Sequence, residues 1–158
     1  MNKAGLSGLL QCFSLCLGFL IGLESFAQVK FQRTFGGTSD DRGYIAYPTS
    51  DGGYLIAGQY KADGATPEDQ FIVKMNSDAT VYWTRTIGGA SNDYIRSSFQ
   101  TTDGGYIFVG HTTSYGSIGA NNIYVTKINS DASTIWTKAI STLGGASLDE
   151  GYSVVQAK

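Results

Sequence analysis

Three aspartates in glycine-rich loops are the side chains of this sequence best suited to holding a metal ion. Asp41, Asp93 and Asp149 each stand four residues after a Gly-Gly pair. Glycine loops rich in oxygen atoms can bind calcium, which takes about six to eight oxygen ligands. Each loop offers only one or two carboxylates, however, and the nonapeptide period of calcium-binding β-rolls is absent. We therefore interpret the three aspartates as caps that close their loops, with calcium binding as the alternative.

The other polar residues give little support to catalytic chemistry. His111 is the only histidine, and a single histidine cannot form a metal site by itself. Nucleophilic catalysis needs a serine or threonine beside a base and an orienting acid, and the sequence contains no such spacing. The adjacent acidic pairs at 40–41 and 149–150 stand in turn contexts. The sequence therefore assigns no catalytic, cofactor-binding or metal-binding residue, and it favours a protein that is not an enzyme.

The charge balance argues against a nucleic-acid partner. The 158 residues include 11 Lys and Arg against 13 Asp and Glu, a net charge of −2, and they contain no basic block. The chain is rich in glycine, with 21 residues, and short apolar runs separate the glycines. Short apolar runs punctuated by turn residues indicate an all-β fold rather than a helical one.

Residues 1–27 have the three-part layout of a secretory signal peptide. Lys3 precedes an apolar run at about 13–23, and small residues lead up to Ala27. A membrane anchor is the alternative, but this run is shorter than the roughly 20 residues that a spanning helix needs. Cleavage after Ala27 would remove both cysteines. We therefore expect a secreted or outer-surface protein without disulfides and without a membrane span in the mature chain.

An internal repeat supplies the elements that would position all of these residues. The sequence "TSDGGYLIAG" at 49–58 returns as "TTDGGYIFVG" at 101–110, within an alignment of 31–69 with 83–121. The pattern continues after short insertions, and "GGASLDEGYSVVQ" opens a third copy. We therefore divide the chain into a signal peptide, 1–27, and a repeat region, 28–158, with repeats at about 31–82, 83–143 and, in part, 144–158.

Each full repeat holds four strand-like runs. The Asp-Gly pairs at 51–52 and 103–104 predict two-residue type I′ hairpins, because glycine supplies positive φ without a steric clash. Gly58 and Gly110 end nearly continuous apolar runs, where we expect a neighbouring sheet to approach closely. The predicted strands cover about 43–49, 53–60, 70–76 and 80–87 in the first repeat, and 94–101, 105–112, 122–129 and 133–140 in the second.

Repeated groups of four antiparallel strands in about 50 residues are typical of β-propeller blades, which cover their faces by stacking. We therefore predict an all-β fold: a partial β-propeller of two four-stranded antiparallel blades plus flanking single strands, preceded by a helical signal peptide. A parallel β-helix is the alternative. Asp78 and Asp131 are expected to close Asn-Ser-Asp turns, and Trp83 and Trp136 to pack between blades.

The order "W…GG-x-S-x-D…DGGY", followed by an apolar run, a glycine and "K-x-N-S-D", resembles the repeats of secreted bacterial β-propeller proteins over essentially all of 29–158. This resemblance implies a multi-blade surface protein whose remaining blades come from a longer chain. Kelch blades are similar, but their apolar strand precedes the glycine pair. The Asp-box of sialidase-type propellers shares the spacing from Asp78 to Trp83, but Thr80 replaces its glycine.

Loop variation predicts where a ligand or partner would bind. The "DGG" and "NSDA" turns recur at one end of each repeat, whereas the loops at 61–69 and 112–122 differ at the other end. Loops that differ on a repeated scaffold commonly carry binding. We expect contacts with an extracellular protein or glycan at that end, with Tyr115 as an anchor.

The expected function is that of an exported, non-enzymatic β-propeller repeat scaffold for binding at the cell surface or outside the cell. The alternative is a fragment of a sugar-active, glycosidase- or sialidase-like propeller enzyme whose catalytic residues lie on missing blades. A closed ring normally needs about four to eight blades. Because two full repeats cannot close one, we expect the N-terminal part of a longer protein.

Overall fold

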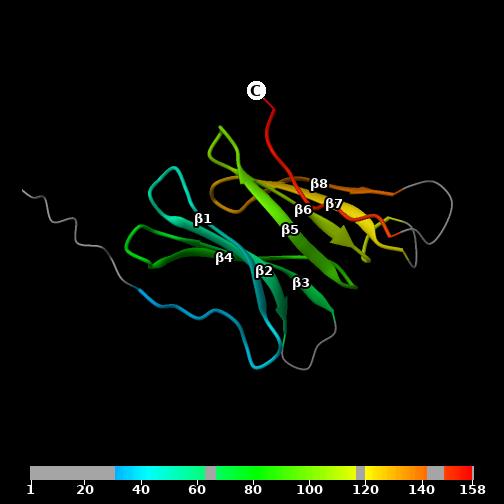
Figure 1. The fold of residues 1–158 in the computed structure, drawn as a ribbon, viewed down its shortest axis with the longest axis horizontal. Coiled ribbons are helices and arrows are strands. Elements are labelled where there is room, and N and C mark those ends of the chain that lie inside the picture. The colour runs from blue at the N-terminus through cyan, green and yellow to red at the C-terminus, as the bar shows by residue number, and fades with distance from the viewer. Residues whose placement is uncertain (1–30, 63–66, 117–119, 142–147, 158) are drawn as a thin grey trace, which may run out of the picture.

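The computed structural model describes residues 31–62, 67–116, 120–141 and 148–157, which form an all-β structure of two four-stranded antiparallel sheets (Figure 1). The predicted signal peptide, 1–27, lies outside the described residues. In the part of the chain that is described, no helix is long and apolar enough to cross a membrane. Sheet A contains β1 (Arg42–Pro48), β2 (Tyr54–Lys61), β3 (Glu68–Met75) and β4 (Val81–Ile87), and sheet B contains β5 (Asp93–Gln100), β6 (Tyr106–Thr112), β7 (Asn122–Ile128) and β8 (Thr134–Ile140).

All eight strands lie within two residues of the predicted bounds at each end. Within each sheet the strands follow one another in chain order, and every neighbouring pair is antiparallel. Short turns permit this arrangement because antiparallel neighbours need no crossover connection. The parallel β-helix is therefore wrong for the described residues, whereas the two four-stranded antiparallel sheets are confirmed.

The Asp-Gly-Gly turns differ from the predicted type I′ hairpins. Gly52 N donates to Thr49 O at 2.9 Å, and Thr49 N donates to Gly53 O at 2.9 Å, as in a three-residue loop with a glycine bulge. Gly52 has a φ of 79°, but Asp51 is not in the positive-φ region. The Asp51 carboxylate instead accepts hydrogen bonds from the Thr49 hydroxyl and Gly53 N, which stabilise the longer loop. The same bonds recur at 101–105.

The Asn-Ser-Asp turns close themselves as predicted. Asp78 Oδ1 accepts hydrogen bonds from Thr80 N at 3.0 Å and from the Thr80 hydroxyl at 2.6 Å. Ala79 follows the aspartate with a φ of 64°, the left-handed conformation that glycine holds in the other turn. The turn at 129–133 repeats the pattern. Both kinds of turn therefore rest on an aspartate that bonds the residue two positions later.

Gly58 and Gly110 are required by a strand of their own sheet, which corrects the expected approach of a neighbouring sheet. A Cβ on Gly58 would lie 1.8 Å from Arg42 O, and one on Gly110 would lie 1.9 Å from Tyr94 O. In both sheets the register of the first strand shifts just after this point, which marks a β-bulge. The bulge brings the first strand so close that only glycine fits opposite it.

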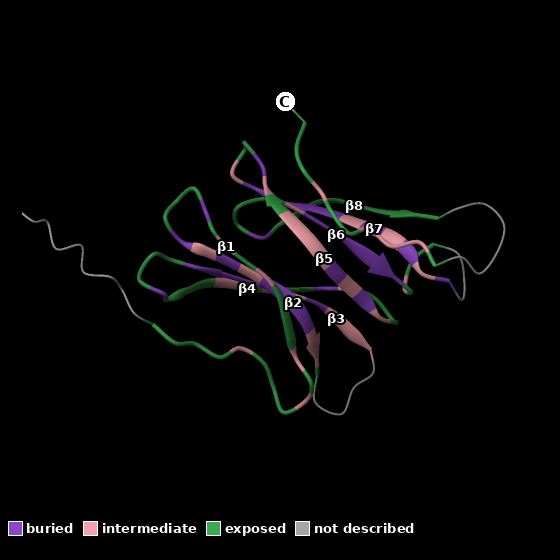
Figure 2. Cartoon of the chain, in the orientation of Figure 1, coloured by how far each residue is buried: buried purple, intermediate pink, exposed green. Residues whose placement is uncertain are grey.

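Burial is highest in the middle strands of each sheet (Figure 2). The strands β3, β6 and β7 are buried along most of their length and β2 along half of it, as their nearly continuous apolar sequences predict. By contrast, β8 is exposed at every residue and β1 at most residues. The two sheets thus cover each other on one side, while the outer strand of sheet B is left open.

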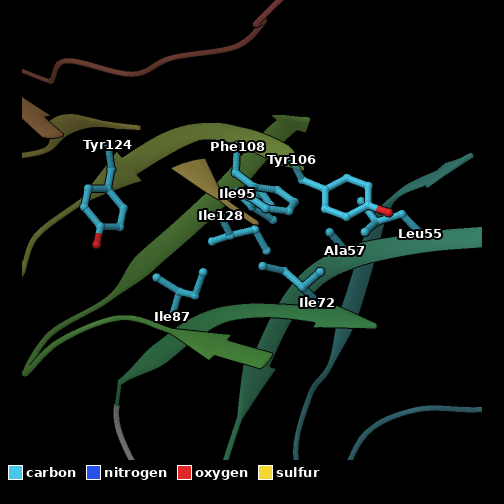
Figure 3. Close-up of a cluster of buried hydrophobic side chains, with 9 residues drawn as sticks. All are labelled: Leu55, Ala57, Ile72, Ile87, Ile95, Tyr106, Phe108, Tyr124 and Ile128. Carbon is cyan, nitrogen blue, oxygen red and sulfur yellow. The ribbon is translucent and has the colours of Figure 1, made fainter. Parts of the chain in front are cut away.

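The main core lies between the two sheets, with sheet A on one side and sheet B on the other (Figure 3). Its side chains come from β2, β3 and β4 of sheet A and from β5, β6 and β7 of sheet B. Neither sheet could bury these residues alone, so each depends on the other for its stability. The cluster consists of Leu55, Ala57, Ile72, Ile87, Ile95, Tyr106, Phe108, Tyr124 and Ile128.

In the residues that the structure describes, the flanking single strands that the sequence predicted are not formed. Residues 31–41 and 149–157 lie outside any strand ladder, and the only pairing near them in the described chain is an isolated bridge between Asn121 and Leu148. A strand requires a hydrogen-bonded neighbour. Both segments instead pack on a sheet face, and Gly151 N donates to Gly110 O at 3.1 Å.

Gly110→Ala should destabilise the protein by at least about 3 kcal/mol, because its Cβ would overlap the Tyr94 carbonyl. Gly104→Ala is the matched control, since its φ is 80° but no atom lies within 4 Å of the added Cβ. We expect the control to cost only about 1 kcal/mol of backbone strain. Urea unfolding of both variants measures the difference, and equal losses would contradict the close approach.

Candidate functional site

The fourth strand of sheet A carries specific contacts to sheet B. The Trp83 ring meets the Tyr106 ring edge-on, with centroids 6.1 Å apart and planes at 68°. The Trp83 indole N–H also donates to Ser130 O at 2.8 Å. Arg85 donates to the Thr134 hydroxyl at 2.8 Å. Trp83 therefore lies between the two sheets, as the sequence predicted, and its polar group is satisfied there.

The same aromatic contact occurs one repeat earlier. Phe31 stands 52 positions before Trp83, and Tyr54 stands 52 positions before Tyr106. The Phe31 and Tyr54 rings also meet edge-on, with centroids 5.5 Å apart and planes at 62°. Segment 31–41 thus packs on sheet A as β4 of sheet A packs on sheet B.

A second recurring contact joins the first strand of each unit to the hairpin of the unit before it. The Gln100 side chain accepts a hydrogen bond from Ser50 N at 2.8 Å. In the next unit the Gln156 side chain accepts one from Thr102 N at 2.8 Å and donates to the Thr102 hydroxyl at 3.0 Å. Segment 148–157 therefore meets sheet B as β5 meets sheet A. The same packing arrangement thus connects four successive parts of the chain: segment 31–41, sheet A, sheet B and segment 148–157.

Three connections between strands lie together at one end of the molecule. We call this end the loop end and define it as residues 67–69, 88–92 and 113–116. Glu68 N donates to the Asn92 side chain at 2.9 Å, and Thr113 N donates to Asn92 O at 2.8 Å. The connection between the sheets thus meets the β2–β3 and β6–β7 connections, as the sequence predicted. A shallow depression of about 290 Å³ is lined here by Pro67, Ala90, Ser91, Asn92 and Thr113.

Tyr115, predicted as a ligand anchor, is already held by the protein itself. Its ring stacks on Tyr124, with centroids 5.4 Å apart, and its hydroxyl donates to Gly88 O at 2.9 Å. The residue remains exposed at the loop end. A ligand would therefore meet a tyrosine of fixed orientation.

The first-strand bulges bring a further pair of side chains toward the loop end, and no sequence pattern indicated them. The register shifts leave Tyr44 in β1 and Arg96 in β5 as the extra residues. The Arg96 guanidinium carbon lies 5.6 Å from the centre of the Tyr44 ring and 5.8 Å from that of Tyr94. The Tyr44 hydroxyl donates to Gln59 at 2.6 Å. An arginine between two tyrosine faces can contact sugars or acidic groups.

The aspartates after the glycine pairs act as loop caps where the structure describes both partners. Asp41 accepts a hydrogen bond from Gly37 N, and Asp93 accepts one from Gly89 N, each at 2.7 Å. Asp149 N donates to Asn121 O, while the glycine pair before Asp149 lies outside the described residues. In the described chain no three His, Cys, Asp or Glu side chains are grouped for a metal ion.

A carboxylate pair lies under the loop end, and the sequence alone did not reveal it. A Cβ on Gly88 would lie 2.1 Å from Asp69 Oδ1 and 3.0 Å from Asp93 Oδ2, so both carboxylates border one glycine. Burial and the negative charge of Asp93 raise the pKa of Asp69. Asp93 itself is fully buried, and the Ser114 hydroxyl donates to its Oδ2 at 2.6 Å.

His111 is buried and faces the first strands. Its ring stacks on Tyr94 with centroids 4.5 Å apart, and its Nδ1 lies 3.9 Å from Glu150 Oε1. Burial lowers the pKa of His111, although the charge of Glu150 opposes that effect. The equivalent residue of the first repeat is Gln59. The histidine therefore serves as a neutral packing residue.

A buried lysine connects the two tight turns at the opposite end of each sheet. Lys74 Nζ lies 2.8 Å from Asp51 Oδ2 and donates to Met75 O at 2.9 Å. The Lys74 and Thr49 hydrogen bonds lower the pKa of Asp51 to about 2. Lys127 makes the equivalent contact with Asp103 at 3.0 Å. These contacts explain why lysine and aspartate recur in both repeats.

Comparison with known protein families gave no match, and comparison with curated proteins gave none either.

Asp69→Asn should raise the free energy of unfolding at pH 7 by roughly 0.5–1 kcal/mol, a modest gain because Asp69 is only partly buried. Asn122 occupies the equivalent position in sheet B, so the amide suits this backbone. Because the folded-state pKa of Asp69 is raised, the loss of stability from its ionisation builds up as the pH rises from the unfolded-state pKa of about 4 and is complete above the folded-state pKa. The gain should therefore shrink as the pH falls toward about 4 and be absent below that pH. Urea unfolding at pH 7 and below about pH 4 measures the gain in stability. An equal gain at both pH values would contradict the repulsion between Asp69 and Asp93.

The wild-type protein should lose stability as the pH falls below about 6.5, because the unfolded state then binds a proton that buried His111 resists. His111→Gln, which copies Gln59 of the first repeat, should flatten this dependence. For one group the slope cannot exceed about 1.4 kcal/mol per pH unit. Urea midpoints on both sides of this pH test the prediction. Parallel curves for the two proteins would show that His111 is not the titrating group.

Proposed function

We propose that this protein is an exported, non-enzymatic β-propeller repeat scaffold that binds an extracellular glycan or protein. One observation carries the propeller proposal: the contact of Phe31 with Tyr54 recurs as that of Trp83 with Tyr106. Units that meet through the same residues at each step are related by a constant rotation, which is how propeller blades stack. Export to the outside of the cell is supported by the signal-peptide pattern of 1–27.

The binding surface belongs at the loop end, where the repeats differ from one another. Tyr44 is exposed there and lies under the Arg96 guanidinium. Tyr115 is exposed at the same end, near the depression lined by Pro67, residues 90–92 and Thr113. Rigid aromatic rings with an arginine give a large contact area at a low cost in side-chain entropy. The opposite end holds nearly identical turns in both repeats and offers no comparable difference.

The carboxylate pair of Asp69 and Asp93 superficially suggests glycoside hydrolysis, because one of the two pKa values is raised. A hydrolase needs both carboxylates in contact with the sugar. Asp93 is fully buried, and its Oδ2 is held by Gly89 N and the Ser114 hydroxyl. This pair is better suited to a structural role, which favours a scaffold over a sugar-active enzyme.

The proposal predicts that the full chain retains one or more oligosaccharides or matrix proteins on an array carrying both classes. Tyr44→Ser and Arg96→Gln should weaken this binding about tenfold or more, because both side chains would contact the ligand. Tyr82→Ser is the matched control, since Tyr82 is exposed in β4 next to the turn at the opposite end.

Equal weakening by Tyr82→Ser would contradict binding at the loop end. Turnover of fluorogenic sialosides or other glycosides by the protein would instead favour the sugar-active enzyme.

A further inference from the structure

The outer strand of sheet B repeats the interface residues of sheet A but leaves them exposed. Trp136 and Ile140 stand 53 positions after Trp83 and Ile87. Ile87 is buried between the sheets, with 8% of its surface exposed, whereas Ile140 is 53% exposed. Trp136 is 39% exposed and has no ring contact among the described residues. Trp136 and Ile140 are the counterparts of residues that join sheet A to sheet B. In the described chain, however, they contact no further sheet.

Segment 148–157 borders the same face and also carries exposed apolar side chains. It is fixed to sheet B by the bonds from Gly151 N to Gly110 O and between Gln156 and Thr102. Tyr152 and Val155 are nevertheless 68% and 73% exposed. We call β8 together with this segment the β8 face; its exposed large apolar residues are Ile135, Trp136, Ile140, Leu148, Tyr152 and Val155.

We propose that the β8 face docks the second, third and fourth strands of a further repeat unit, in which 148–157 serves as the first strand. This inference rests on the propeller architecture proposed above. The tyrosine of the docking unit's Asp-Gly-Gly-Tyr turn would lie against Trp136, as Tyr54 lies against Phe31 and Tyr106 against Trp83. The incoming second strand would pair with 148–157, as β2 pairs with β1.

A further unit fits this face better than the first sheet of a second copy does. In a second copy, Phe31 already covers Tyr54, the residue that Trp136 would need. Pro48 of that copy would also stand in place of Gln156, whose side chain bonds Thr102. Proline can neither donate nor accept these side-chain bonds. The occupant therefore uses 148–157 as its own first strand rather than displacing it.

The test extends the chain after Gln156 with residues 49–87, which supply the three missing strands. Trp83→Phe in both the host and the added unit leaves Trp136 as the only tryptophan. Phenylalanine suits that position because Phe31 holds it one repeat earlier. Acrylamide quenching of Trp136 should fall about twofold or more relative to the unextended Trp83→Phe chain, with emission at shorter wavelength, because the ring leaves water.

A length-matched control carries serine in place of the added copies of Tyr54 and Leu55. Its Trp136 should remain as quenchable as in the unextended chain. A second extension, residues 101–140 with phenylalanine in place of the added Trp136, guards against poor folding of one unit. Unchanged quenching in both extended chains would overturn the proposal.

Dilution-sensitive protection of Trp136 in the unextended chain, together with a dimer on size exclusion, would also overturn it, because a second copy would then be the occupant. Neither result depends on ligand binding at the loop end. Failure of the docking proposal can therefore be distinguished from failure of the scaffold proposal.

Discussion

A four-stranded sheet with apolar side chains on both faces cannot shield either face from water by itself, and this constraint governs the whole structure. Sheet A buries one face against sheet B in a shared core. The ring contact of Trp83 with Tyr106 repeats that of Phe31 with Tyr54, so neighbouring parts of the chain pack through equivalent residues. Stability in such an array is roughly the sum of unit and neighbour terms. β8 carries the equivalent residues, Trp136 and Ile140, and both are exposed.

The strands and turns could be predicted from the sequence because their signals are local. Apolar runs such as that of β2 and the Asp-Gly-Gly and Asn-Ser-Asp turns depend on residues within a few positions of one another. The turn type was wrong because the bond from the Thr49 hydroxyl to Asp51 favours a longer loop than the dipeptide alone indicates. Comparison of the two repeats also placed Trp83 correctly between the sheets.

The candidate site could be predicted only in outline. Loop divergence indicated which connections meet at one end of the molecule, but Tyr44 and Arg96 meet because of bulges in two different sheets. Asp69 approaches Asp93 across the interface between sheets, where spacing along the chain carries no information. The residue that a side chain contacts on a second sheet depends on the tertiary structure, and no short sequence pattern indicates it.

The buried lysine explains why one end of each unit is uniform and the other is free to vary. Lys74 ties the hairpin aspartate Asp51 to the end of the third strand, and Lys127 does the same with Asp103. Loss of the turn aspartate would leave a buried ammonium ion without its counter-charge. The loops at the other end lie away from these pairs and differ between the two repeats. A buried lysine paired with a turn aspartate thus fixes one end of each sheet, so that the loops at the other end can change in sequence without loosening the sheet that carries them.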